Sequence, residues 1–259
     1  IIADKTIDLT CTPNGMRGGN VFANSYLAPI DVANIDPEND LDGVEGTFYL
    51  FNSGSWNQWQ NEGGKDHMNY GVSPGQYYAL SPKGASLMDK EYDQTTIPPM
   101  QGVYMKANSG GGTITLNYEK HVWNNTQTAQ MNQPLRVAGK ESEAYAQSLD
   151  FQRVRLQVNS ENSGADRMYI IQDSMATSGY DNGYDAEKLM DIYTNEPFGK
   201  MEISSTDHMD GMYIGFQAGE DTHYIMTFTS LIGDSLYLYD LEEDKFVEML
   251  DGEQYHFSA

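Results

Sequence analysis

The chain has 259 residues, of which 39% are hydrophobic and 12% aromatic, and it contains 25 glycines. Lys and Arg number 15 against 38 Asp and Glu, which gives a net charge of -23. Such a surface repels phosphate backbones, whose binding needs clustered cations, so nucleic acid is excluded as a partner. No apolar run reaches the ~18 residues of a membrane-spanning helix, and we expect no membrane span.

Short apolar stretches separated by turn residues fill the first half of the chain. They lie at 46–52, 76–80, 102–107 and 113–118. Aromatic and β-branched side chains fit a pleated, half-buried surface, so we expect a strand at each stretch. Glycine and asparagine at Asn108–Gly112 predict a hairpin loop between the last two strands.

The stretch 149–216 has the clearest pattern in the chain. In Arg153–Val158 the apolar residues occupy every second position, which predicts a strand with one buried face and an arginine-bearing face that meets water. A second strand is expected at 168–171, followed by a sharp Gly- and Asp-rich turn at 178–185. We expect a short helix at 185–192.

Further strands are predicted at 224–229, 235–239, 246–250 and 253–259. Strands that recur about every 8 to 12 residues, with almost no helical periodicity, are typical of antiparallel sandwiches. We therefore predict an all-β fold of two consecutive antiparallel β-sandwich domains, jelly-roll or Ig-like, with long loops. Polar residues near position 140 predict the boundary, so the two domains are residues 1–139 and 140–259.

Three segments carry a resemblance to a known group of proteins. Residues 19–31 read GNVFANSYLAPID, residues 97–107 read IPPMQGVYMKA, and residues 179–186 read GYDNGYDA. They resemble β-sandwich modules of very large secreted or cell-surface proteins of Bacteroidetes, of the type IX secretion or adhesin-like kind. Ser25 and Met100 depart from a Pro and a Gly of that pattern. The resemblance covers most of the chain and implies an extracellular or cell-surface location, but it specifies no chemistry.

We expect a non-catalytic structural or adhesive module of a larger surface protein. The chain begins Ile1-Ile2-Ala3-Asp4, without an initiator methionine or signal peptide, so we expect a piece of a longer chain. Its expected partners are other domains of the same chain, and glycans or neighbouring surface proteins. An accessory domain of a secreted hydrolase is an alternative, because it would share the fold.

A carbohydrate-binding module is the main alternative function. Trp56 and Trp59, with Tyr70 nearby, offer flat side chains that stack on the apolar faces of sugar rings. The same indoles could instead fold back as a lid on the core, because they bury a large apolar area.

Two acidic loops are candidates for calcium, the one cofactor that the sequence suggests. Hard oxygen ligands lie close together in both of them, as calcium prefers. The alternative is an ordinary Asx turn in the first loop and a solvated turn in the second. The candidate ligands are Asp181, Asn182 and Asp185 in the first loop, and Glu38, Asp40 and Asp42 in the second.

No motif in the sequence predicts catalysis. The five histidines are scattered without a zinc-binding spacing, and Cys11 is a lone cysteine without an adjacent cation. Asp173-Ser174-Met175 and Asp234-Ser235-Leu236 match the O-glycosylation pattern of Bacteroidetes, which makes Ser174 and Ser235 candidate acceptors.

Overall fold

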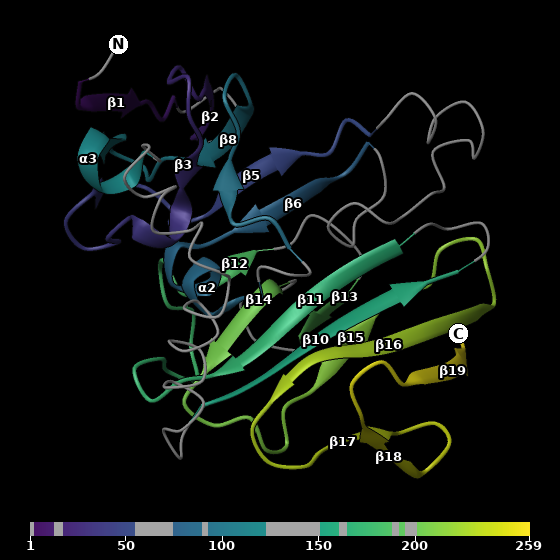
Figure 1. The fold of residues 1–259 in the computed structure, drawn as a ribbon. Helices are drawn as coiled ribbons and strands as arrows, with labels where there is room; N and C mark the ends of the chain where they lie inside the picture. Colours follow the sequence, from purple (N-terminus) through teal and green to yellow (C-terminus); the bar gives the residue numbers. More distant parts are fainter. Residues whose placement is uncertain are drawn as a thin grey trace.

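A computed structural model gives the arrangement of the chain (Figure 1). Among the described residues, strand residues far outnumber helical residues, which confirms the all-β prediction. Short antiparallel ladders dominate, as the alternating sequence predicts. The residues that the structure describes are 3–12, 18–54, 75–89, 93–122, 151–160, 165–187, 192–194 (backbone only) and 201–259.

The described residues between 3 and 122, here called the N-half, form three antiparallel sheets around one core. Their orders are β1-β9-β4, β2-β8-β5-β6 and β3-β7. The strands are β1 (Lys5–Leu9), β2 (Gly19–Ala23), β3 (Ile30–Asp31), β4 (Leu41–Asp42), β5 (Phe48–Phe51), β6 (Tyr77–Leu80), β7 (Thr96–Ile97), β8 (Gly102–Lys106) and β9 (Gly112–Leu116).

The expected hairpin at Asn108–Gly112 is wrong, although both flanking strands exist. Strand β8 pairs with β2 and β5, whereas β9 pairs with β1 and β4. The loop therefore carries the chain from one sheet to another. It turns sharply at Gly111, whose φ of 79° is costly for a residue with a side chain. Pairing with strands distant in the sequence has displaced the local pairing.

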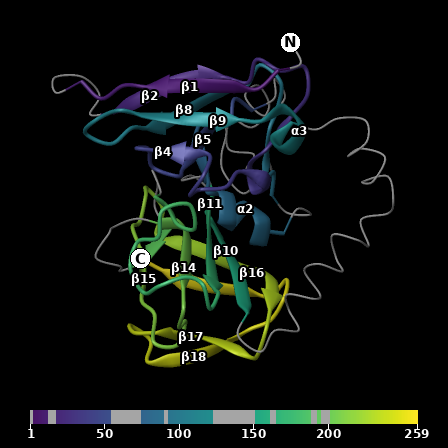
Figure 2. The same ribbon diagram turned by 90° about the vertical axis from the view of Figure 1, so that its left-hand side faces the viewer.

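The described part of the N-half also has the short helical segments η1 (Val32–Asn34), α2 (Pro82–Leu87) and α3 (Tyr118–His121). Helix α2 has Pro82 in its first turn, where the missing N–H costs nothing. A Cβ on Gly84 of α2 would lie 2.9 Å from the Ile203 side chain on strand β14. Helix α2 therefore packs directly against the second half of the chain (Figure 2).

Residues 151–259, here called the C-half, are built on one six-stranded sheet of order β12-β14-β11-β10-β16-β19, with the ladders β13-β15 and β17-β18 beside it. The strands are β10 (Gln152–Asn159), β11 (Ala165–Gln172), β12 (Ala186–Glu187), β13 (Ile192–Thr194), β14 (Met201–Thr206), β15 (Ile214–Phe216), β16 (His223–Ile232), β17 (Leu236–Asp240), β18 (Lys245–Met249) and β19 (Gln254–Ser258).

Two expectations for the C-half are wrong. Strands β11 and β14 pair in parallel, so this sheet is mixed rather than purely antiparallel. The expected helix at 185–192 does not form at its start, because Ala186 pairs with Ile203 as part of β12 and is fully buried there. Residues 188–191 of that segment lie outside the described ranges.

The six-stranded sheet uses both of its faces for packing. One face carries Val154, Leu156 and Val158 into a core that the hairpin β17–β18 covers. The other face carries Tyr169 and Ile203 into the core of the N-half. The two halves therefore stack in layers with α2 between them (Figure 2). The predicted boundary near residue 140 falls in 123–150, outside the described residues.

Candidate functional site

The contact between the two halves is centred on a buried carboxylate, that of Asp93. It lies 2.8 Å from Arg155 Nε and 2.9 Å from Arg167 Nε. The Tyr169 hydroxyl donates a third contact to it at 2.8 Å. All three partners come from strands β10 and β11 of the C-half, whereas Asp93 belongs to the N-half. We call these four residues, together with Glu202, the interlock cluster.

Glu202 on β14 completes the interlock cluster from the other side of Arg167. Its Oε1 atom lies 3.0 Å from Arg167 Nη2. Its Oε2 atom accepts the backbone N–H of Ala79, on strand β6 of the N-half, at 2.6 Å. The Glu202 carboxylate thus pairs with a guanidinium of its own half and accepts a backbone N–H from the edge strand β6 of the other half.

The charges of the interlock cluster are balanced, because two carboxylates face two guanidiniums. Arg167 is fully buried. Burial alone lowers the pKa of its guanidinium, but Asp93 and Glu202 outweigh this effect and raise the pKa above its ordinary value. Burial and the Asp93 charge raise the pKa of Tyr169, so its hydroxyl stays a proton donor. The cluster therefore brings opposite charges within ion-pair distance in the buried contact between the halves.

The expectation that the arginine face of β10 meets water is wrong. Arg153 and Arg155 are 4% and 3% exposed. The Arg153 Nε donates to the Ser230 carbonyl at 3.1 Å, and its guanidinium lies 3.4 Å from Asp89 of the N-half. Burial lowers the pKa of Arg153. The alternation of β10 is real, but its polar face packs against the N-half.

The first acidic loop, 181–185, also joins the halves. Asn182 accepts the Gly46 N–H at 2.6 Å and donates to the Val44 carbonyl at 3.2 Å. Asp185 is buried, and its two carboxylate oxygens accept the N–H groups of Asp181 and Ser205, each at 2.6 Å. The Asp185 carboxylate thus accepts an N–H four residues earlier and another on β14, which is not the bond of an Asx turn, and the amide of Asn182 reaches into the N-half.

The second acidic loop places one of its carboxylates on a buried histidine. Asp40 Oδ2 lies 2.9 Å from Lys120 Nζ and 3.1 Å from His121 Nε2. Glu38 and Asp42 are exposed. Within the described ranges, no group of three or more His, Cys, Asp or Glu side chains is arranged to hold a metal ion. Calcium binding at either loop stays a prediction.

The predicted sugar platform of Trp56, Trp59 and Tyr70 lies at residues 55–74, outside the described ranges, and stays a prediction. The candidate O-glycosylation sites can be placed. Ser174 lies in a turn after β11 and Ser235 directly precedes β17, and both are exposed. Modification at either serine also stays a prediction.

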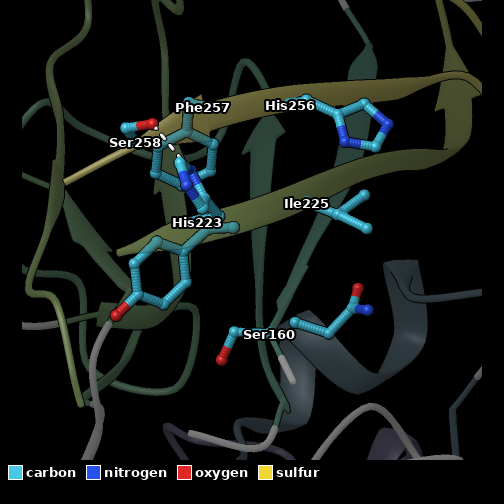
Figure 3. A pocket seen from close by; sticks show the side chains of 8 residues that line it. Ser160, His223, Ile225, His256, Phe257 and Ser258 are labelled. Carbon is cyan, nitrogen blue, oxygen red and sulfur yellow. Dashed lines mark hydrogen bonds between the residues drawn. The ribbon is translucent and has the colours of Figure 1, made fainter. Parts of the chain in front are cut away.

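A pocket opens at one end of the six-stranded sheet (Figure 3). His223 and His256 come from the neighbouring strands β16 and β19, and the His223 Nδ1 lies 3.0 Å from the Ser258 hydroxyl oxygen. Among the described residues that line it, none is a carboxylate or a thiol. Asn159, Ser160 and the two imidazoles can exchange hydrogen bonds with a polar ligand, but no acid among the described lining residues orients a histidine as a base.

Comparison with known proteins gives one informative similarity. No family model matches the chain, and no solved structure matches it. The chain is 28% identical, over an alignment 274 positions long, to the minor fimbrium subunit Mfa5 of Porphyromonas gingivalis. The alignment covers 100% of the chain and 21% of the relative, so the chain spans about a fifth of that protein.

This relative is a subunit of a bacterial surface fimbrium. The similarity assigns the chain to the bacterial cell surface, which confirms the location predicted from the sequence. Within the described part of the chain, no helix is long and apolar enough to cross a membrane.

Proposed function

We propose that the chain is a non-catalytic structural module of a large bacterial surface protein, in which two β-sandwich halves are interlocked into one stiff unit. The observation that carries this proposal is the interlock cluster. A buried carboxylate of one half is enclosed by two arginines and a tyrosine of the other half. Such a contact is costly to separate, because separation leaves charges without their partners.

Further contacts between the halves surround the interlock cluster. Lys106 of the N-half lies 2.8 Å from Glu187 of the C-half. The Ser81 hydroxyl donates to the Tyr184 carbonyl at 2.6 Å, and the Lys83 N–H donates to the Gly183 carbonyl at 2.8 Å. Together with the Asn182 bonds, these contacts fix the rotation of one half against the other. A module of this kind transmits load instead of hinging.

The similarity to a fimbrium subunit supports a role in assembly or adhesion at the cell surface. The partners that we propose are other domains of the same long chain and neighbouring surface subunits. A net charge of -23 favours solubility and opposes unspecific association at the crowded cell surface.

Single-molecule pulling tests the proposal. The chain is placed between two marker domains and stretched from its ends. An interlocked unit should release its length in one cooperative step. Two independent steps that occur in random order, each releasing about half of the length, would contradict the interlock. A matched pair of variants sharpens the result, because Asp93→Asn should split the step, whereas the exposed change Asp42→Asn should leave it intact.

A further inference from the structure

The hairpin β17–β18 forms the outermost layer of the C-half (Figure 2). Its inner face carries Leu236, Leu238 and Val247, which pack against the core under the six-stranded sheet. Its outer face points away from the rest of the molecule. The hairpin therefore offers a sheet face that no other described element covers.

That outer face is aromatic. Tyr239 pairs with Phe246, and Tyr237 pairs with Glu248, so these four side chains lie on the same side of the hairpin. Tyr237, Tyr239 and Phe246 are 55%, 42% and 70% exposed. We call these three side chains the aromatic face. Exposed aromatic residues that gather on one face are typical of interaction surfaces.

The aromatic face is held in place before any partner arrives. The rings of Tyr239 and Phe246 stack at 4.6 Å with an interplanar angle of 26°. The Tyr239 hydroxyl donates to Asp244 in the turn. Asp240 anchors the same turn, because it accepts the Tyr255 hydroxyl of β19 at 2.6 Å. Little side-chain freedom is lost when such a surface binds.

The rim of the aromatic face is strongly acidic. Residues 234–251 contain seven carboxylates and one ammonium group, that of Lys245. Glu242 and Glu243 in the hairpin turn and Glu248 opposite Tyr237 are all exposed. Cations are attracted both to carboxylates and to the faces of aromatic rings. Charge complementarity thus selects a positively charged partner.

We propose that the aromatic face docks a basic segment of another surface protein, with Arg or Lys side chains lying over the rings and pairing with Glu242, Glu243 and Glu248. A second copy of this chain does not fit, because its own charge of -23 would be repelled. A neutral glycan would use the rings but would gain nothing from the acidic rim. The inference deepens the proposed function and rests on it for the cell-surface setting.

Peptide binding measured by biolayer interferometry tests this proposal on the intact chain. The probe is a short peptide that alternates arginine with leucine and threonine, and its control replaces each arginine with glutamate. We expect the arginine peptide to bind, with an affinity that falls as salt rises, and the glutamate peptide not to bind. Removing the rings with Tyr237→Thr, Tyr239→Thr and Phe246→Thr should weaken binding about tenfold or more.

A matched aromatic control lies in the other half. Phe51 and Tyr77 form an exposed cross-strand pair on β5 and β6, 41% and 40% exposed, with ring centres 5.2 Å apart. Phe51→Thr with Tyr77→Thr should leave the peptide affinity unchanged. Equal binding by the hairpin triple variant and by this control variant would overturn the proposal.

The acidic rim has its own matched control. Glu242→Gln, Glu243→Gln and Glu248→Gln should weaken binding and flatten its salt dependence. The exposed changes Glu38→Gln, Asp42→Asn and Glu119→Gln remove equal charge at a distance and should change the affinity less than about twofold. If the aromatic variant does not fold, the difference in peptide affinity between the rim variant and its control tests the proposal instead.

Two other results would overturn the proposal. The first is that the chain binds neutral glycans on an array and loses this binding when the three rings are removed. The second is that the chain forms a concentration-dependent dimer and the triple variant does not. Neither result bears on the interlock. The triple variant should still unfold in one step on pulling, so failure at the hairpin and failure of the stiff unit are distinguishable.

Discussion

Replacing Asp93 with asparagine removes one charge from the centre of the interlock cluster and keeps its shape. In the native chain two carboxylates balance the guanidiniums of Arg155 and Arg167. After Asp93→Asn only Glu202 remains to balance both. Asparagine also presents an amide NH₂ group to donors, so one buried donor loses its acceptor.

The expected cost follows from the burial of these groups. Arg155 and Asp93 are each 3% exposed, and Arg167 is fully buried. Breaking a buried ion pair by removing one partner costs about 3–5 kcal/mol of unfolding free energy. For a chain of this size each kcal/mol corresponds to about 2–4 °C, so the melting temperature should fall by roughly 6–20 °C.

Urea denaturation followed by circular dichroism measures this loss. Asp42→Asn is the control, because Asp42 is exposed and surface substitutions are nearly neutral. Adding Arg155→Gln to Asp93→Asn should cost less than the sum of the two single changes, since it removes the charge that was left without a partner. A loss below about 1 kcal/mol for Asp93→Asn would refute the reasoning that the buried pair holds the halves together.

Three further predictions concern other contacts. Burial lowers the pKa of His121, and its Nδ1 already accepts the Asn117 N–H at 3.0 Å. The unfolded chain therefore binds this proton more readily, and the melting temperature should fall as pH drops below about 6.5, a slope that His121→Gln should reduce. Asn182→Ala, which loses both bonds to the N-half, should cost about 1–3 kcal/mol in urea denaturation, and no measurable loss would contradict its docking role. Calcium at the two acidic loops, if held only by the native chain, should raise stability, so a chelator should lower the melting temperature by several degrees, and a change of less than about one degree would contradict the calcium prediction.

The sequence predicted the strands well, because strand identity is a local property. The alternation of 153–158 lies within β10, and the apolar run 168–171 lies within β11. The same holds for 224–229 within β16. A period of two reports which residues share a face, whatever the rest of the chain does.

What each face contacts could not be read from the same pattern. Arg155 and Asp93 are 62 positions apart, and Glu202 and Ala79 are 123 positions apart. A polar face that meets water and a polar face that meets a complementary polar surface have the same alternation. The sequence pattern therefore does not predict the interlock cluster, and it wrongly predicts that the arginines of β10 are exposed to water.

The aromatic face was hidden for a different reason. In Leu236–Tyr239 leucine and tyrosine alternate, so both faces of β17 are apolar by composition. Only burial separates the leucines, which pack inward, from the tyrosines, which are exposed. The sequence predicted the two strands at 235–239 and 246–250, but nothing local showed that they pair with each other or that one face of the pair lacks a covering layer.

The interlock cluster attaches the N-half to the middle of the six-stranded sheet. The arginines that pair with Asp93 come from β10 and β11, the two central strands of that sheet. Load that enters the N-half at Asp93 is thus distributed over both neighbours of these strands, whereas contact at an edge strand would peel that strand away. A surface module that must stay rigid between its neighbours needs its buried charge pairs at this position.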